Sequence, residues 1–329
     1  MKILVIGGGG YVGSLLVQKL LELNFEVKVL DLFIYGEPKV VFGSYNNSNL
    51  LHSIKGDMRD IDLVDNILNE VDTVIHLACI SNDPSFELNP NLSKSINYDC
   101  FYPLVKICKK KIKKYIYASS SSVYGIKKEE NVTEDLCLEP LTDYSKFKAL
   151  CEYIILNESG SKICSTVIRP ATVCGYSPRT RLDVIVNILT NHALNNRRIV
   201  VHGGQQKRPN IHISDMVNSY LEILKQPDNL IENEIFNVGC ENLELQKIAE
   251  IVKKKVGKDI IISNEKSTDL RSYHISSEKI KKRISFTFKK SIGHAVDDLA
   301  EAFNLKLLKN SMTDPRYFNI MMMKKIKLI

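Results

Sequence analysis

The chain has 329 residues, of which 44% are hydrophobic and 25% charged, and its formal net charge is +7. This composition is that of an ordinary globular protein and excludes a disordered chain, and no apolar run is long enough to cross a bilayer. A strand is predicted directly after Met1, which leaves no room for a signal peptide. The eight cysteines show no close metal-ligand pairing. We therefore expect a cytoplasmic protein with reduced thiols, no metal and no membrane partner.

The positive charge comes partly from lysine runs, such as 109–111 and the tail 323–327. No aromatic platform or recognised nucleic-acid module accompanies these runs, so we expect solvated faces and no nucleic-acid partner. A basic interior would also suit an anionic substrate.

Predicted strands and helices alternate along the first half of the chain. Apolar runs predict strands, and apolar residues at helical spacing predict helices. The predicted strands are Lys2 to Ile6, Glu26 to Leu30, Thr73 to Leu77, Tyr115 to Ser119 and Ile163 to Ile168. The predicted helices are Tyr11 to Leu23, Asp60 to Val71, Asn91 to Lys111, Tyr144 to Asn157, Leu182 to Asn196 and Leu245 to Val256.

This alternation predicts an α/β fold, a Rossmann-type doubly wound parallel sheet. Beyond Pro170 the pattern becomes irregular, with loops rich in Gly, Pro and Arg. We therefore expect a dinucleotide-binding domain at 1–170 that carries the catalytic residues. A smaller α/β lobe at 171–329 would line a substrate cleft, with some strands returning to the sheet.

The first chemical motif is the glycine run Gly7 to Gly10, followed by Gly13, between a strand and a helix. This arrangement brings the backbone close to a dinucleotide pyrophosphate, although a glycine-rich turn also serves simply to cross from strand to helix. The second strand ends at Asp31, where a carboxylate would accept hydrogen bonds from the adenosine ribose and repel a 2′-phosphate. NAD is therefore expected rather than NADP; the alternative for Asp31 is an ordinary turn residue.

The second motif is Tyr144 with Lys148, one helical turn apart and downstream of the serine run Ser119 to Ser122. A phenol whose pKa is lowered by a nearby ammonium and a positive nicotinamide ring can take a proton from an alcohol. Such a pair is also common on helix surfaces. Its occurrence after a dinucleotide motif favours hydride chemistry on an alcohol or ketone.

Taken together, five motifs resemble the extended short-chain dehydrogenase/reductase family of nucleotide-sugar epimerases, dehydratases and related oxidoreductases. They are Gly7-x-x-Gly10-x-x-Gly13, His76-Leu77-Ala78, Ser119 to Gly125, Tyr144-x-x-x-Lys148 and Arg169-Pro170. The resemblance covers nearly the whole chain. It implies Tyr144, Lys148 and Ser120 as catalytic residues and a nucleotide sugar as the substrate.

The resemblance also implies the residues that bind each ligand. For NAD these are Gly7, Gly10, Tyr11, Val12, Gly13, Asp31, Asp57, Met58, Leu77, Ala78, Asn97, Ser119, Tyr144 and Lys148. For the nucleotide sugar they are Ser81, Asn82, Ser121, Ser122, Thr172, Arg179, Asn187, Arg208 and Arg271. Arg208 and Arg271 are the expected diphosphate contacts because a guanidinium binds phosphate in a bidentate manner; a surface ion pair is the alternative.

Three departures from the family pattern narrow the expected activity. Ser121-Ser122 stands where 4,6-dehydratases carry an Asp-Glu acid/base pair, which disfavours dehydration. Thr172 replaces the asparagine that often contacts the substrate phosphate. The loop Ser81 to Pro84 differs from that of galactose epimerases.

The overall run is most similar to a subgroup from bacterial surface-polysaccharide (capsule) clusters that oxidises C4 of GDP-linked heptose. We therefore expect an NAD-dependent C4 dehydrogenase of a GDP-linked sugar, with an NAD-dependent nucleotide-sugar 4-epimerase as the alternative. A third candidate, a non-catalytic nucleotide sensor, has no need of the Ser/Tyr/Lys set.

The resemblance further implies a homodimer. In this family the helices matching Asn91 to Lys111 and Tyr144 to Asn157 pair across a two-fold axis. Phe101, Leu104, Val105 and Cys108 give the first of them a broad apolar face.

Overall fold

The computed structural model describes residues 1–158, 163–266 and 272–328. Its centre is a seven-stranded parallel sheet with the order β10-β6-β5-β4-β1-β2-β3. The strands are β1 (Lys2–Ile6), β2 (Glu26–Asp31), β3 (Leu51–Lys55), β4 (Thr73–His76), β5 (Lys114–Ala118), β6 (Cys164–Pro170) and β10 (Glu234–Val238). The predicted α/β, doubly wound fold is confirmed.

Alternate residues of the strands supply two separate cores, one on each face of the sheet, because side chains alternate along a strand. In β1, Ile3 and Val5 pack with one set of helices, whereas Leu4 and Ile6 pack with the other. The first set comprises α1 (Tyr11–Glu22), α2 (Pro38–Phe42), α9 (Ile213–Lys225) and α12 (Glu278–Ile284). The second comprises α3 (Ile61–Ile67), α6 (Phe101–Lys111) and α7 (Asp143–Glu158).

The strand order reverses between β1 and β4, which are neighbours in the sheet but lead to helices on opposite faces. In doubly wound sheets, ligands bind in the crevice beyond the carboxyl ends of the strands at this reversal. The fold therefore defines where the functional site should lie.

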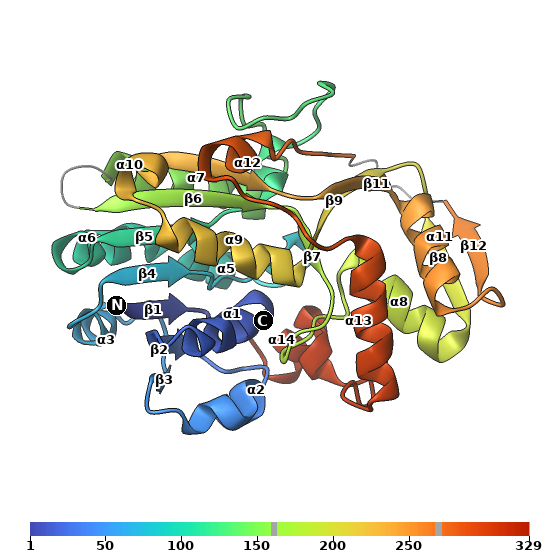
Figure 1. Ribbon diagram of the computed structural model, residues 1–329, viewed down its shortest axis with the longest axis horizontal. Coiled ribbons are helices and arrows are strands. Elements are labelled where there is room, and N and C mark those ends of the chain that lie inside the picture. The colour runs from blue at the N-terminus through green and yellow to red at the C-terminus, as the bar shows by residue number, and fades with distance from the viewer. Residues whose placement is uncertain (159–162, 267–271, 329) are drawn as a thin grey trace.

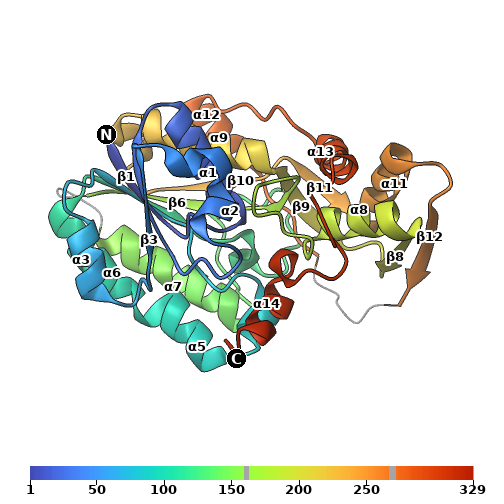
Figure 2. The same cartoon turned by 90° about the horizontal axis from the view of Figure 1, so that it is seen from below.

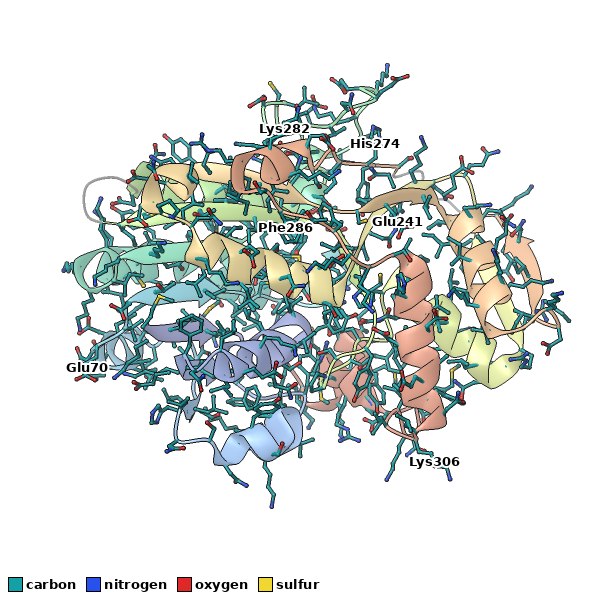
Figure 3. The ribbon with its side chains drawn as sticks, viewed as in Figure 1. Glu70, Glu241, His274, Lys282, Phe286 and Lys306 are labelled. Carbon is teal, nitrogen blue, oxygen red and sulfur yellow. The ribbon has the colours of Figure 1, made fainter. Side chains whose placement is uncertain are left out.

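A smaller part stands beyond the carboxyl ends of the large sheet and is the right-hand part of Figure 1. Its three-stranded sheet contains β7 (Thr172–Cys174), β9 (Lys207–His212) and β11 (Glu241–Glu244), and a two-stranded sheet pairs β8 (Arg198–His202) with β12 (Ile261–Glu265). The helices packed with these strands are α8 (Ile185–Asn196), α11 (Leu245–Val256) and α13 (Ile292–Asn304). Within this part, Glu241 at the start of β11 (labelled in Figure 3) accepts a hydrogen bond from the Ile292 amide of α13 at 2.5 Å.

The remaining helices are short: α4 (Asp83–Phe86), α5 (Pro90–Lys94), α10 (Asp228–Ile231) and α14 (Asn319–Lys325). Figures 1 and 2 both show α14 where the large sheet meets the smaller part. β10 returns to the large sheet from beyond Pro170. The division into domains at 1–170 and 171–329 stays a prediction.

Three predicted helices differ from the structure by more than two residues or by an interruption, whereas the other predicted boundaries agree to within two residues. The helix expected at Asn91 to Lys111 is interrupted by a π-helical turn at Ser95–Asp99. The helix expected from Asp60 ends at Ile67, and the one expected from Leu182 begins at Ile185. Helix ends depend on capping contacts with other segments, which periodicity alone does not reveal.

The apolar face proposed for dimerisation is buried within the chain itself. Phe101, Leu104, Val105 and Cys108 are at most 1% exposed and belong to the core beneath the large sheet. This corrects the sequence argument, in which an amphipathic pattern could not distinguish a core face from an interface face. The exposed apolar side chains on α6 and α7 are Tyr102, Leu150 and Tyr153.

We still predict a homodimer, now through Tyr102, Leu150 and Tyr153. Light scattering at micromolar concentration should give twice the mass of one chain. Tyr153→Lys should shift the protein toward the monomer, because the charge would be buried in an apolar contact. Val40→Lys, at an exposed apolar residue of α2, is the control. A wild-type protein that scatters as a monomer would rule the dimer out.

Candidate active site

A cavity of about 500 Å³ lies at the strand reversal, between the large sheet and the smaller part. Most of the residues predicted to bind cofactor or substrate line it, although they come from segments far apart in the sequence. These are Gly7, Gly10, Tyr11, Val12, Gly13, Asp31, Asp57, Met58, Leu77, Ala78, Ser81, Asn82, Ser119, Ser120, Ser121, Ser122, Tyr144, Lys148, Thr172, Arg179 and Arg208.

The glycine loop fits a dinucleotide diphosphate. Gly7 has a φ of 88°, and a Cβ built on it would lie 2.5 Å from the Ala78 amide nitrogen, so only glycine is accommodated. At Gly10 a Cβ would meet only the Gly7 carbonyl oxygen, at 3.3 Å. Gly10 caps α1 without a side-chain hydrogen bond, which leaves the first amide groups of the helix for an anion.

Asp31 is held in place by the loop that it faces. One carboxylate oxygen accepts a hydrogen bond from the Gly9 amide at 2.9 Å, and the other accepts from the Phe33 amide at 2.7 Å. Burial raises the pKa of Asp31, while these two amides act to lower it. Each oxygen keeps a further lone pair, which suits the two hydroxyls of an adenosine ribose.

Asp57 and Met58 line the same end of the cavity. Asp57 pairs with Arg59 at 2.6 Å, whereas Met58 is buried among Leu4, Ile6 and Leu30. The apolar wall that results is suited to an adenine ring.

The predicted catalytic pair lies on the cavity face of α7. Tyr144 is 9% exposed and Lys148 is 3% exposed. The Lys148 ammonium donates to the Ala118 carbonyl at 2.6 Å and lies 4.9 Å from the centre of the Tyr117 ring. Lys148 is therefore anchored at the end of β5, which orients its charge toward the cavity.

Burial raises the pKa of Tyr144, and the neighbouring Cys79 and Asp83 add to this. A hydrogen bond with Ser120 and the charge of Arg181 act in the opposite direction. In the protein alone, Tyr144 is thus a weaker acid than a free phenol, contrary to the lowering expected from Lys148. The positive nicotinamide ring of the oxidised cofactor would supply the missing stabilisation of the phenolate.

The hydroxyls of the serine run have two roles: one holds neighbouring side chains in place, and others face the cavity. Ser119 donates a short hydrogen bond to the buried Glu152 carboxylate. Ser120 begins the 3-10 turn Ser121–Tyr124, where its Oγ accepts from the Ser122 amide at 3.1 Å and shares a hydrogen bond with the Ser122 Oγ at 2.8 Å. Ser120 also forms a hydrogen bond with Tyr144, so its hydroxyl lies beside the phenol.

Two predicted ligand contacts, Asn97 and Asn187, are not among the residues that line the cavity, and their direct contact with cofactor and substrate stays a prediction. Asn97 accepts from the Ile80 amide at 2.8 Å and donates to the Ile80 carbonyl at 2.9 Å. Asn187 is fully buried, accepts from the Gly175 amide at 2.9 Å and donates to the Arg181 carbonyl at 2.7 Å. Both amides are occupied by backbone groups and position the segments that line the cavity.

Only one of the two arginines expected to bind the diphosphate belongs to the described residues. Arg208 lines the cavity, with its guanidinium carbon 4.9 Å from the centre of the Tyr273 ring. Arg271 lies outside the residues that the structure describes.

The sequence analysis missed several polar residues of the cavity. Arg181 donates to Asp183 at 2.8 Å and to the Ser81 hydroxyl at 3.1 Å, and its charge acts on Tyr144. Asn319, from the distant α14, donates to the same Ser81 hydroxyl at 3.0 Å. The cluster Arg179 to Asp183 was a usable signal in the sequence, but nothing there connected Asn319 to the site.

Over the described ranges, no group of three or more His, Cys, Asp or Glu is placed to hold a metal ion. Likewise, no described helix is long and apolar enough to span a membrane.

Comparison with known proteins identifies close relatives. The chain is 30% identical over 285 residues to UDP-glucose 4-epimerase of Lactobacillus helveticus, covering 79% of this chain and 83% of that protein. It is also 30% identical over 270 residues to dTDP-D-glucose 4,6-dehydratase of Dictyostelium discoideum, covering 75% of this chain and 61% of that protein.

A solved structure supports the same relationship. UDP-glucuronic acid 4-epimerase of Bacillus cereus, in complex with UDP-glucuronic acid and NAD, superposes with a TM-score of 0.83 at 26% identity. The match covers 93% of this chain and 99% of that chain. The model of the NAD dependent epimerase/dehydratase family matches residues 3–239. The chain therefore belongs to the NAD dependent epimerase/dehydratase family, whose named cofactor is the one predicted from the glycine loop and Asp31.

Proposed function

We propose that this protein is an NAD-dependent 4-epimerase of a nucleotide-linked hexose, most closely of the UDP-sugar class. The observation that carries the proposal is that Tyr144, Lys148 and Ser120 line the same cavity as the glycine loop and Asp31. A proton acceptor and a dinucleotide site thus meet at one place, as reversible oxidation of an alcohol requires.

The relatives favour the epimerase over the dehydrogenase that the sequence first suggested. Both 4-epimerases described above act, by their names, on UDP-linked sugars. Neither they nor the dehydratase is a GDP-heptose dehydrogenase. Ser121 and Ser122 line the cavity where a dehydratase needs an acid/base pair, and their hydroxyls do not ionise near neutral pH.

In the proposed reaction, NAD held by the glycine loop and Asp31 would supply the acceptor for the hydride from C4 of the sugar and the donor for its return. The Tyr144 phenolate takes the proton of the C4 hydroxyl, while Ser120 orients that oxygen by a hydrogen bond. Lys148 keeps a positive charge near the phenolate. The keto sugar then rotates in the site, so that the hydride returns to the opposite face of C4. The same tyrosine gives its proton back to the C4 oxygen, so the sugar is neither oxidised nor reduced overall.

The decisive experiment incubates the purified protein with UDP-, dTDP- and GDP-linked sugars and identifies the products by mass and chromatography. We expect a product of unchanged mass that elutes as the C4 epimer, with a UDP-sugar as the best substrate. Loss of two hydrogens would instead establish a dehydrogenase, and loss of water a dehydratase.

Tyr144→Phe should lower the rate by about a hundredfold or more, because the ring is kept but proton transfer is lost. Nucleotide-sugar binding should be retained. Ser120→Ala should cost less, since only one orienting hydrogen bond is lost. Tyr153→Phe, an exposed tyrosine on the same helix, is the matched control. A Tyr144→Phe protein that turns over substrate at nearly the wild-type rate would exclude the phenolate mechanism.

With NAD bound, the wild-type rate should rise with pH as Tyr144 ionises, at a pH below that at which a free phenol does, because the nicotinamide charge would offset the burial that raises the Tyr144 pKa in the protein alone. Arg181→Met should move this rise to higher pH, because the Arg181 charge acts to lower the pKa of Tyr144. A pH–rate profile of kcat measures both. An unchanged pH–rate profile in Arg181→Met would show that Arg181 has no effect on the pKa of the proton acceptor.

The dinucleotide released on denaturation should be NAD(H), because the Asp31 carboxylate repels the 2′-phosphate of NADP. Mass spectrometry of the released ligand tests this. NADP as the main species would refute the assignment of Asp31 to the adenosine ribose.

A further inference from the structure

Arg179 lines the cavity together with the residues of the glycine loop. Arg179 is 5% exposed, and its guanidinium carbon lies 3.5 Å from the centre of the Tyr35 ring. Its backbone amide donates to the Ser14 hydroxyl on α1 at 3.2 Å. Arg179 is therefore tied to the helix that follows the glycine loop, at the cofactor end of the cavity.

The charge of Arg179 is poorly compensated. Its Nη2 donates to the Asn319 side-chain oxygen at 2.7 Å, while its Nε is buried without a hydrogen-bond partner in the part of the chain that the structure describes. Burial lowers the pKa of Arg179 to about 10, and the charge of Arg181 acts in the same direction, while Tyr35, Asp183 and Asp31 act against this. A buried guanidinium donor without a partner is costly, so the site favours an added anion.

Asn319 connects this arginine to the other parts of the cavity. Besides accepting from Arg179, its side chain donates to the Ser81 hydroxyl at 3.0 Å, and its backbone amide donates to Asp183 at 2.8 Å. One turn further along α14, Met323 is 2% exposed and belongs to the apolar cluster that includes Met58. The helix thus joins the charged wall and the apolar end of the cofactor site.

We propose that Arg179, held by Asn319, is a second binding group for the diphosphate of the NAD cofactor, and that α14 closes the outer side of this site. The diphosphate would lie between the amide groups of the α1 N-terminus and the Arg179 guanidinium, which presents a planar fork to phosphate oxygens. This moves Arg179 from the predicted sugar-nucleotide contacts to the cofactor. Arg208, at the Tyr273 end, remains the candidate for the sugar nucleotide.

The role given to Arg179 rests on the proposed function, because tight retention of NAD is what an epimerase needs. An epimerase must return the hydride to the same sugar, so it benefits from a cofactor held on both sides through successive turnovers. A dehydrogenase instead has to exchange its reduced cofactor or reoxidise it with a second substrate.

The test measures NAD binding without any sugar. NAD content of the purified protein, the dissociation constant for NAD of nucleotide-free protein, and the rate of NAD release are compared in wild type, Arg179→Met and Asn319→Leu. The matched control is Arg198→Met, an exposed arginine on β8 that does not line the cavity. UDP alone is the probe for the sugar-nucleotide end.

Arg179→Met should weaken NAD binding by about tenfold or more and reduce its dependence on KCl, because a charged phosphate contact is lost. Asn319→Leu should release NAD several times faster, and Arg198→Met should match wild type. UDP binding should be unchanged in all three variants.

Wild-type NAD affinity and content in Arg179→Met would overturn the proposal, as would a loss of UDP binding in place of NAD binding. If Arg179→Met does not fold, Asn319→Leu and Arg179→Lys replace it in the test. The proposal is then overturned if both variants bind and release NAD as the wild type does. Because no sugar is present, the NAD-binding results can be interpreted even if the epimerase assay detects no activity. Conversely, unchanged NAD binding in the variants would not contradict the epimerase proposal.

Discussion

The active site depends on one buried ion pair, between Arg169 at the end of β6 and Glu152 on α7. Both side chains are 3% exposed, and Arg169 donates to Glu152 through Nη2 at 2.7 Å and through Nε at 3.1 Å. Glu152 lies two helical turns beyond Tyr144 and one beyond Lys148, so fixing its direction fixes the rotation of the helix face that carries both. Removing one partner of such a pair costs about 3–5 kcal/mol, because the other charge stays buried.

The ion pair also organises the serine run and the edge of the large sheet. Glu152 accepts from Ser119, and Arg169 donates to the Tyr124 hydroxyl at 2.6 Å. Tyr124 in turn donates to Asn237 on β10 at 2.8 Å. The strand that returns from the second half of the chain is thereby linked to the catalytic helix. The projecting loop beyond Gly125 is tied down separately, where His274 contacts the Glu129 carbonyl at 2.7 Å (Figure 3).

Some groups in the cavity raise the pKa of the Tyr144 phenol and others lower it. Burial makes Tyr144 a weak acid, Asp83 opposes its ionisation, and Arg181 and Ser120 favour it. A cationic cofactor ring would therefore change the acidity of Tyr144 more than it would in water, because the surroundings are poorly solvated. Proton transfer would in this way be coupled to the oxidation state of the cofactor, which suits the reversible oxidation that the proposed epimerase reaction needs.

Local patterns were enough to predict the parallel sheet, the glycine loop, Asp31 and the Tyr144/Lys148 pair, because each depends on periodicity or on residues close together in the chain. The roles of segments that are distant in the chain follow instead from long-range packing. The apolar face of α6 proved to be core, Asn97 and Asn187 support the wall, and Asn319 comes to Arg179 across 140 positions of the chain. Burial and long-range contacts decide these roles, and no local pattern encodes them.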